Sequence, residues 1–236
     1  MKSSTVLAGL LPAALAQNTS CDQWASFSNE QYILSNDLWG QDAGEGWGCI
    51  TNDGLTSTSA AFHADWNWSG GQSNVKAFPS VQRVIPLGRR ISSISSMPTE
   101  ATWDYTGSDI RADVAYDVFS SSVPTNPTWD GDFEIMLLGK FGDVGPLGSS
   151  QGTVTVAGRS WELFWGYNGA MQVYSFVAPT NINQFSGDFK NFFDFLSESK
   201  GVNFDDQYLL SYQFGSEPFT GDCSKFTTSH WSAEVV

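Results

Sequence analysis

The chain of 236 residues is long enough for one large all-β domain or two small ones, and 41% hydrophobic residues with a mean hydropathy of −0.21 argue against a disordered or fibrous protein. Its net charge of −14 repels phosphate backbones and argues against nucleic acid as a partner. Only 15% of the residues are charged, yet ten Trp, seven Tyr and 17 Phe are present. This mixture suits neutral, hydroxyl-rich partners such as sugars, although most of the aromatic residues are expected in the core.

The first 16 residues have the three parts of a secretory signal peptide. Lys2 supplies a positive charge, residues 6–15 are apolar, and Ala-Leu-Ala at 14–16 is a small-x-small cleavage site. No apolar run reaches the ~20 residues that a transmembrane helix requires, so no membrane partner is expected. We predict a secreted, extracellular protein whose mature chain, residues 17–236, is a single monomeric domain. No linker separates off a carbohydrate-binding module.

The chain has three cysteines, and a secreted protein is expected to oxidise two of them. Cys21 and Cys49 are the expected pair, which would staple the N-terminal strand to its neighbour. Cys223 is then left as a free thiol. With two His and no paired Cys/His motif, the sequence predicts neither a metal site nor a cofactor.

Short alternating runs separated by Gly, Asn, Ser and Pro occur throughout the chain. Such runs predict a β-sandwich or barrel. The clearest are residues 110–119, 133–138, 153–156, 171–177 and 207–214.

One segment, residues 188–200, breaks this pattern because its apolar residues recur at helical spacing. Ser186 is the expected N-cap and Gly201 the expected C′ residue. The sequence therefore predicts a single amphipathic helix whose apolar stripe packs in the core. That stripe consists of Phe189, Phe192, Phe193 and Leu196.

Because side chains alternate along a strand, each residue of the predicted strands can be assigned to a face. Asp113 and Asp117 share one face of their strand, and Glu134 and Met136 share one face of theirs. In the last strand Ser211, Gln213, Gly215 and Glu217 form the polar face, opposite Tyr208, Leu210, Tyr212 and Phe214. If these strands lie in one curved sheet, their carboxylates converge in its groove.

Two carboxyl groups on either side of a scissile bond are what glycosidic cleavage requires, one as acid and one as nucleophile or base. Glu134 and Glu217 fit this requirement. Both lie in apolar surroundings without adjacent basic residues, which favours a raised pKa for one of them. Asp117 could raise it further or share a proton.

Long ordered stretches of the chain resemble glycoside hydrolase family 12, the compact fungal endoglucanases. The resemblance covers about Cys21 to the C-terminus. The matching stretches are LWG at 38–40, HADWNWSGG at 63–71, ISSMP at 94–98, DVAYD at 113–117, GDFEIM at 131–136, GDVGP at 142–146, GYNGAMQVYSF at 166–176 and SYQFGSEPFTG at 211–221.

The resemblance implies a fold and a mechanism. The fold is an all-β jelly roll of two stacked antiparallel sheets with one α-helix and a concave substrate cleft. Glu134 resembles the nucleophile, Glu217 the acid/base, and Asp117 the carboxylate that hydrogen-bonds the nucleophile. Members of the family retain anomeric configuration through a covalent glycosyl-enzyme.

The resemblance also suggests residues that bind substrate. Asn36 and Trp39 resemble residues that hold sugars on the non-reducing side, and Trp24 extends that platform. Met136, on the face of Glu134, is a further candidate. For Trp66 and Trp68, core packing and sugar contact both remain open.

One departure from the family pattern follows Met136. Where the family usually continues with an aliphatic residue, Trp, Leu and Gly, this chain has Leu137, Leu138 and Gly139. A one-residue deletion flips every later side chain to the other face unless a bulge or turn absorbs it. Glu134 precedes the gap, so its own placement is not affected.

The sequence leaves three functions open. The first is a retaining endo-β-1,4-glucanase that acts on cellulose-type or mixed-linkage glucan. The second is a xyloglucan-specific endoglucanase with the same chemistry. The third is an inactive glucan-binding sandwich, for which the missing Trp is the only argument.

Overall fold

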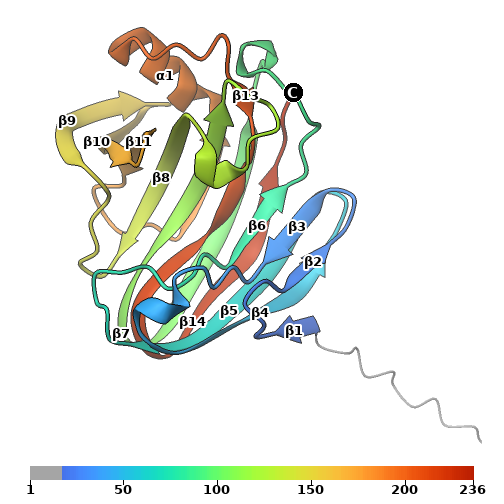
Figure 1. Ribbon diagram of the computed structural model, residues 1–236, viewed down its shortest axis with the longest axis vertical. Coiled ribbons are helices and arrows are strands. Elements are labelled where there is room, and N and C mark those ends of the chain that lie inside the picture. Colours follow the sequence, from blue (N-terminus) through green and yellow to red (C-terminus); the bar gives the residue numbers. More distant parts are fainter. Residues whose placement is uncertain (1–17) are drawn as a thin grey trace, which may run out of the picture.

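The computed structural model describes residues 18–236 (Figure 1). The predicted signal peptide and its cleavage site lie outside the described residues. The helices are α1 (Lys190–Lys200) and the short 3-10 turns η1 (Gln41–Ala43), η2 (Ile91–Ser93) and η3 (Thr128–Asp130). The strands are β1 (Asn18–Ser20), β2 (Ser26–Ser28), β3 (Tyr32–Ser35), β4 (Glu45–Leu55), β5 (Ala60–Ser69), β6 (Ser80–Arg83), β7 (Pro98–Ser121), β8 (Phe133–Phe141), β9 (Ser149–Val156), β10 (Arg159–Asn168), β11 (Met171–Val177), β12 (Gln184–Asp188), β13 (Tyr208–Leu209) and β14 (Gln213–Ala233).

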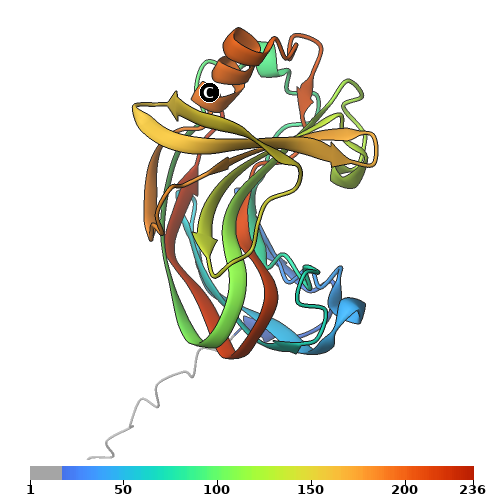
Figure 2. The ribbon, with the colours of Figure 1, turned by 90° about the vertical axis from the view of Figure 1, so that its left-hand side faces the viewer.

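The two longest strands, β7 and β14, run through both layers of the molecule (Figure 2). The second half of β7 pairs with β8 and with the start of β14, whereas its first half pairs with β12 and with the end of β14. The β7–β14 ladder shifts register three times between Pro218 and Lys225, where bulges allow both strands to turn over. The strands therefore form one continuous sheet folded into two layers, the predicted jelly-roll sandwich.

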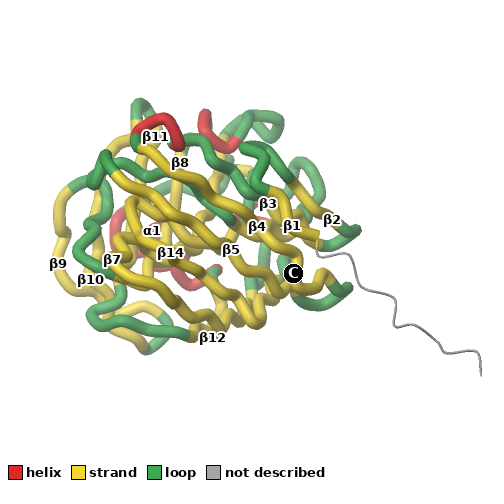
Figure 3. The backbone as a smooth tube through the Cα atoms, turned by 90° about the horizontal axis from the view of Figure 1, so that it is seen from below, coloured by secondary structure: helices red, strands yellow, loops and turns green. Residues whose placement is uncertain are grey.

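The layers have different strand orders. The outer layer runs β1-β4-β5-β14-β7, and Figure 3 shows β4, β5, β14 and β7 side by side. The inner layer continues from β14 and β7 through β8, β11, β10 and β9. One neighbouring pair in it, β8 and β11, is parallel. The prediction of purely antiparallel sheets is wrong at this pair, because the chain crosses to the far edge at β9 and returns through β10.

The main hydrophobic core fills the space between the layers, and the predicted strand faces meet it as expected. Val114 and Tyr116 of β7 and Ile135 and Leu137 of β8 are buried there. Their neighbours Asp113, Asp117, Glu134 and Met136 point to the opposite face of the inner layer. Trp66 and Trp68 are 1% and 3% exposed in the same core, which decides in favour of core packing for both.

The predicted strand over 207–214 is interrupted. Only Tyr208–Leu209 forms β13, and β14 begins at Gln213. Leu209 and Tyr212 enter the core, whereas Leu210 is half-buried, so the predicted alternation is wrong before Tyr212. It holds from Tyr212 onward, which keeps Glu217 on the polar face.

The helix α1 packs at one end of the sandwich (Figure 1), with all four predicted apolar residues buried. Phe192 lies edge-on to Trp161 and Phe176, with ring centroids 5.7 and 4.9 Å away. Gly201 ends the helix in the left-handed conformation, as predicted, with φ of 69°. Ser186 is not the N-cap, because it lies in β12.

Asp188 orders the start of the helix instead. Its Oδ1 accepts hydrogen bonds from the backbone N–H of Lys190 at 2.9 Å and of Met97 at 2.7 Å. The same carboxylate therefore joins the helix start to the segment that leads into β7.

The predicted disulfide between Cys21 and Cys49 is present and links the segment after β1 to β4. Cys223 is an exposed free thiol. Within residues 18–236, no helix is long and apolar enough to cross a membrane.

Candidate active site

A pocket of about 500 Å³ opens on the face of the inner layer that points away from the core. It brings together the three predicted catalytic carboxylates with an aromatic and polar lining. The lining residues are Trp24, Asp37, Trp39, Phe78, Asp117, Phe119, Thr128, Trp129, Glu134, Asn168, Met171, Gln213 and Glu217.

Three adjacent strands, β14, β7 and β8, each contribute one carboxyl group to this pocket, those of Glu217, Asp117 and Glu134. Glu217 is level with Asp113 on β7, whereas Glu134 is level with Phe119. The two glutamates therefore lie on opposite sides of β7, with Asp117 between their levels. This is the convergence that strand alternation predicted.

A second, smaller apolar cluster, called the floor here, lies on the face of the inner layer where the pocket opens, and its Phe78 lines the pocket. It consists of Phe78, Ala115, Met136, Leu138, Val173 and Val177, with Phe164 packed against it. Met136 is only 7% exposed and belongs to this floor, so the structure does not place it as a substrate contact. Met171 of β11 lines the pocket instead. The floor removes water from the carboxylates that stand on it.

Burial is the main influence on the ionisation of these carboxyl groups. Burial first and the negative charge of Glu217 second together raise the pKa of Glu134 to about 8. Burial also raises the pKa of Glu217, which a hydrogen bond with Asp113 opposes. The pKa of Asp117 is raised well above its usual range by burial and then by the charge of Glu134.

The predicted hydrogen bond from Asp117 to Glu134 is not among the contacts of this structure. Asp117 Oδ1 is buried and has no hydrogen-bond partner within residues 18–236, so Asp117 acts on Glu134 through charge. Because the groups are coupled, their protons belong to the cluster as a whole. The pKa values of Glu134 and Glu217 are both raised, whereas the sequence suggested a raised pKa for only one of them.

Three exposed tryptophans border the pocket. Trp24 and Trp39 come from the N-terminal segment and are 65% and 54% exposed, whereas Trp129 comes from η3 and is 78% exposed. Their indole faces are available to stack on sugar rings. Trp129 was not predicted from the sequence, although a tryptophan in a Pro- and Asp-rich connection between strands is a signal of a binding loop.

The structure places Asn36 away from the pocket. Asn36 is 1% exposed, and its amide donates hydrogen bonds to the carbonyls of Asp22 at 3.0 Å and Gly48 at 3.3 Å. Its neighbour Asp37 lines the pocket instead. Asp37 has a left-handed φ of 45°, so the alternation that ends with β3 does not continue through it. Burial raises the pKa of Asp37 to about 6.

Strand β8 is regular despite the missing residue after Met136. It pairs with β7 over nine residues and with β11 over six, without a register shift. Leu138 therefore stays on the face of Glu134 and joins the pocket floor. No bulge within β8 absorbs the deletion, and Glu134 keeps its place in the pocket.

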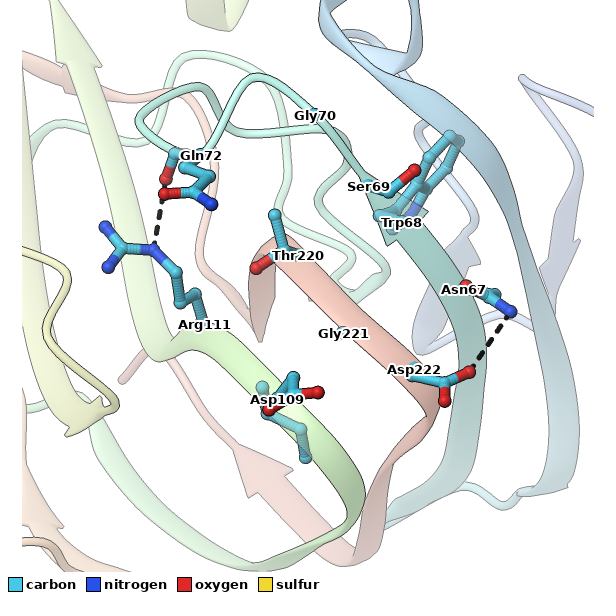
Figure 4. Close-up of a pocket in the computed structure, with 11 residues that line it drawn as sticks. Asn67, Trp68, Ser69, Gly70, Gln72, Asp109, Arg111, Thr220, Gly221 and Asp222 are labelled. Carbon is cyan, nitrogen blue, oxygen red and sulfur yellow. Dashed lines mark hydrogen bonds between the residues drawn. The ribbon is translucent and has the colours of Figure 1, made fainter.

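A second pocket of about 590 Å³ lies where β7 and β14 turn over (Figure 4). Asn67 donates a hydrogen bond to Asp222 at 3.4 Å there, and Arg111 donates one to the carbonyl of Gln72 at 3.2 Å. None of the predicted catalytic carboxylates lines it. The polar groups of this second pocket join the loop around Gln72 to β7 and join β5 to β14. Because the paired carboxyl groups lie in the first pocket, we take the first pocket as the reactive one.

Comparison with known proteins gives the same assignment as the pocket. The family model for glycosyl hydrolase family 12 matches residues 30–236. The chain belongs to glycosyl hydrolase family 12. Among family 12 structures, the chain matches endoglucanase 3 of Trichoderma harzianum with a TM-score of 0.91 and 54% identity, covering 95% of this chain and 100% of that one.

Other relatives carry two kinds of name. Endoglucanase A of Aspergillus kawachii is 39% identical over 240 residues, and a probable xyloglucan-specific endo-β-1,4-glucanase A of Aspergillus fumigatus is 44% identical over 243 residues. Each match covers 100% of both chains. The family 12 catalytic domain of Humicola grisea Cel12A, solved with a thio cellotetraose, superposes with a TM-score of 0.90 at 41% identity over 92% of this chain and 99% of that one.

Proposed function

We propose that this glycoside hydrolase, an endo-β-1,4-glucanase, cleaves its glucan with retention of anomeric configuration. Glu134 is the nucleophile, Glu217 the acid/base, and Asp117 adjusts the charge on Glu134. The observation that carries the proposal is the presence of these three carboxyl groups, from three adjacent strands, in one pocket on an apolar floor.

In the first step the Glu134 carboxylate attacks the anomeric carbon while Glu217 donates its proton to the departing glycosidic oxygen. The carbon–oxygen bond breaks, and the sugar is held as an ester of Glu134. In the second step Glu217, now a carboxylate, takes a proton from a water molecule that attacks the same carbon and releases Glu134. The raised pKa values keep a proton within the cluster at the start of the cycle.

The substrate is a β-1,4-glucan, and we propose a linear chain of the cellulose or mixed-linkage type. Trp24 and Trp39 on one side and Trp129 on η3 offer flat surfaces for unbranched sugar rings. Xyloglucan is the second candidate, favoured by the relatives named xyloglucan-specific. Side-by-side rates on carboxymethyl cellulose, mixed-linkage β-glucan and xyloglucan decide between them.

The protein is proposed to act outside the cell as a monomer on polysaccharide. The predicted secretory leader is the argument for secretion, and the acidic surface is the argument against nucleic acid as a partner.

The test is the stereochemistry of the first product, with Glu134→Gln as the matched variant. Proton NMR during the first minutes of hydrolysis should show the β-anomer before mutarotation. Glu134→Gln keeps the shape of the side chain but removes the attacking oxygen, so hydrolysis should fall by at least about 10³-fold with an unchanged circular dichroism spectrum. An initial α-anomer, or full activity in Glu134→Gln, would overturn the assignment.

A further inference from the structure

Asp113 has no role in the proposed mechanism, yet it lies directly opposite Glu217. The two residues are register partners on β7 and β14. Directly opposed side chains in an antiparallel pair share one face, with Cβ atoms about 4.5–5.5 Å apart. The two carboxyl groups are close enough to share a hydrogen bond when one of them carries a proton.

The Asp113 carboxyl group is sealed from water. The residue is 7% exposed, and its Oδ1 is buried without a hydrogen-bond partner within residues 18–236. A buried carboxyl oxygen without a partner is costly unless the group serves another purpose. Glu217, its register partner on β14, is the carboxyl group that faces this side chain.

The backbone on both sides of this pair is fixed by a cluster of hydroxyl groups. The hydroxyls of Tyr105 and Ser216 each lie 2.7 Å from the carbonyl oxygen of Asp113 and 2.7 Å from each other. Tyr105 reaches this carbonyl from the outer half of β7, and Ser216 immediately precedes Glu217. The strand positions of Asp113 and Glu217 are therefore locked together from the core side.

Two carboxylates cannot hydrogen-bond each other unless one of them carries a proton. Burial and then the charge of Glu217 raise the pKa of Asp113 well above its usual range, so Asp113 is the proton carrier of the pair when Glu217 is ionised. The other charged residues near Asp113 are Asp117 and Arg111, both on β7. Arg111 is paired with Asp143 and with the carbonyl of Gln72.

We propose that Asp113 is a positioning residue for Glu217, which it holds by a carboxyl–carboxyl hydrogen bond throughout the catalytic cycle. When Glu217 gives its proton to the glycosidic oxygen, the Asp113 O–H donates to the new carboxylate and keeps it aimed at the pocket. When Glu217 takes a proton from water, the Asp113 proton stays where it is. This inference rests on the proposed acid/base role of Glu217.

The experiment compares two substrates that differ in their need for a general acid. A cello-oligosaccharide needs a proton on its leaving oxygen, whereas a dinitrophenyl cellobioside does not. Asp113→Ala should lower kcat/KM for the oligosaccharide by about tenfold or more, a part of the ~10²–10⁴-fold that general acid catalysis supplies. It should change kcat/KM for the aryl cellobioside by less than about twofold, because that step does not use the general acid.

Two further variants separate positioning from structural damage. Asp113→Asn keeps a hydrogen-bond donor and should restore the oligosaccharide rate to within about threefold of the parent. Asp113→Ser replaces Asp113→Ala if the latter does not fold. Asp104→Ala, an exposed aspartate on the outer half of the same strand, is the matched control and should change neither rate.

The pH profile adds an independent readout. In Asp113→Ala the Glu217 carboxylate loses a donor, so the basic limb of kcat/KM for the oligosaccharide should move to higher pH. Movement to lower pH would mean that Asp113 is ionised beside Glu217, and it would overturn the proposal.

Glu217→Ala, measured on the same two substrates, separates a failure of the Asp113 proposal from a failure of the proposed function. If it loses the oligosaccharide reaction but keeps kcat/KM for the aryl cellobioside, the proposed function stands. An equal effect of Asp113→Ala on both substrates, or no effect on either, then overturns the Asp113 proposal alone. If Glu217→Ala shows no such selectivity, the proposed function itself fails.

Discussion

Glu134 carries a thermodynamic cost that follows from its place on an apolar floor. Its pKa is raised from 4.5 to about 8, so between these values the native protein binds a proton that the unfolded chain has released. The unfolding free energy therefore falls as pH rises through this window, with a slope of up to about 1.4 kcal/mol per pH unit for each such proton. Below pH 4.5 Glu134 is protonated in both the folded and the unfolded protein, so its burial no longer lowers the unfolding free energy through ionisation.

Glu134→Gln should therefore be more stable than the parent protein at pH 7.5 but not at pH 4. The amide has no charge to desolvate, so the gain at the higher pH should be on the order of 1–3 kcal/mol. Urea unfolding at the two pH values measures it, with exposed Glu198→Gln as a control that should show no gain. An equal stability difference at both pH values would contradict the role assigned to burial.

Single residues also mark where sequence reasoning fails. Glu134, Asp117 and Glu217 could be placed on one face because strand alternation is strict within β7, β8 and β14. Asn36 was assigned to sugar binding from the family resemblance, whereas the structure buries it and bonds its amide to the carbonyls of Asp22 and Gly48. The chain leaves β3 at Ser35 and Asp37 adopts a left-handed φ, so Asp37 lines the pocket instead. This change of backbone region is not visible in the sequence.

At the scale of elements, β8 owes its regular pairing to a glycine on its core side. Gly139 lies opposite Val114 of β7, and a Cβ built on it would lie 2.6 Å from Val114 Cγ1. The absence of a side chain at Gly139 thus leaves room for Val114 next to the segment of β8 that lacks one residue.

Gly139→Ala should therefore destabilise the protein by about 1–3 kcal/mol through overpacking. Combining it with Val114→Ala should recover part of that loss, with a coupling of about 0.5–3 kcal/mol. Thermal or urea unfolding of the two single variants and the double variant measures the coupling. Gly54→Ala in β4, where no atom lies within 4 Å of the added Cβ, is the control; strictly additive effects of the Gly139 and Val114 variants would refute the contact.

Other elements differ in how far the sequence determines them. The helix and its glycine stop were predictable because both follow from local spacing, whereas its true N-terminal contact, Asp188, depends on Met97 from a distant segment. The interruption before β14 was equally invisible, since Leu209 and Leu210 are alike in chemistry and only the packing decides which is buried.

At the scale of the whole molecule, composition and strand pattern predict a sandwich, but not that one sheet forms both layers. That arrangement depends on the bulges between Pro218 and Lys225, where β7 and β14 turn over. The parallel pairing of β8 with β11 depends on the path of the chain through β9 and β10. The alternation of side chains is the same in parallel and antiparallel strands, so the sequence pattern does not reveal this pairing.

The folded sheet leaves its pocket bordered by short connections, and this determines the mode of attack. The connection between β7 and β8 and the segment after β3 are the borders that carry Trp129 and Trp39. Since neither is long enough to roof the groove within residues 18–236, a glucan can enter at any point along its length. The viscosity of a mixed-linkage glucan solution should therefore fall much faster than reducing ends appear. Viscometry with a parallel reducing-end assay measures both, Glu134→Gln provides the blank, and steady release of reducing ends at constant viscosity would show attack from chain ends instead.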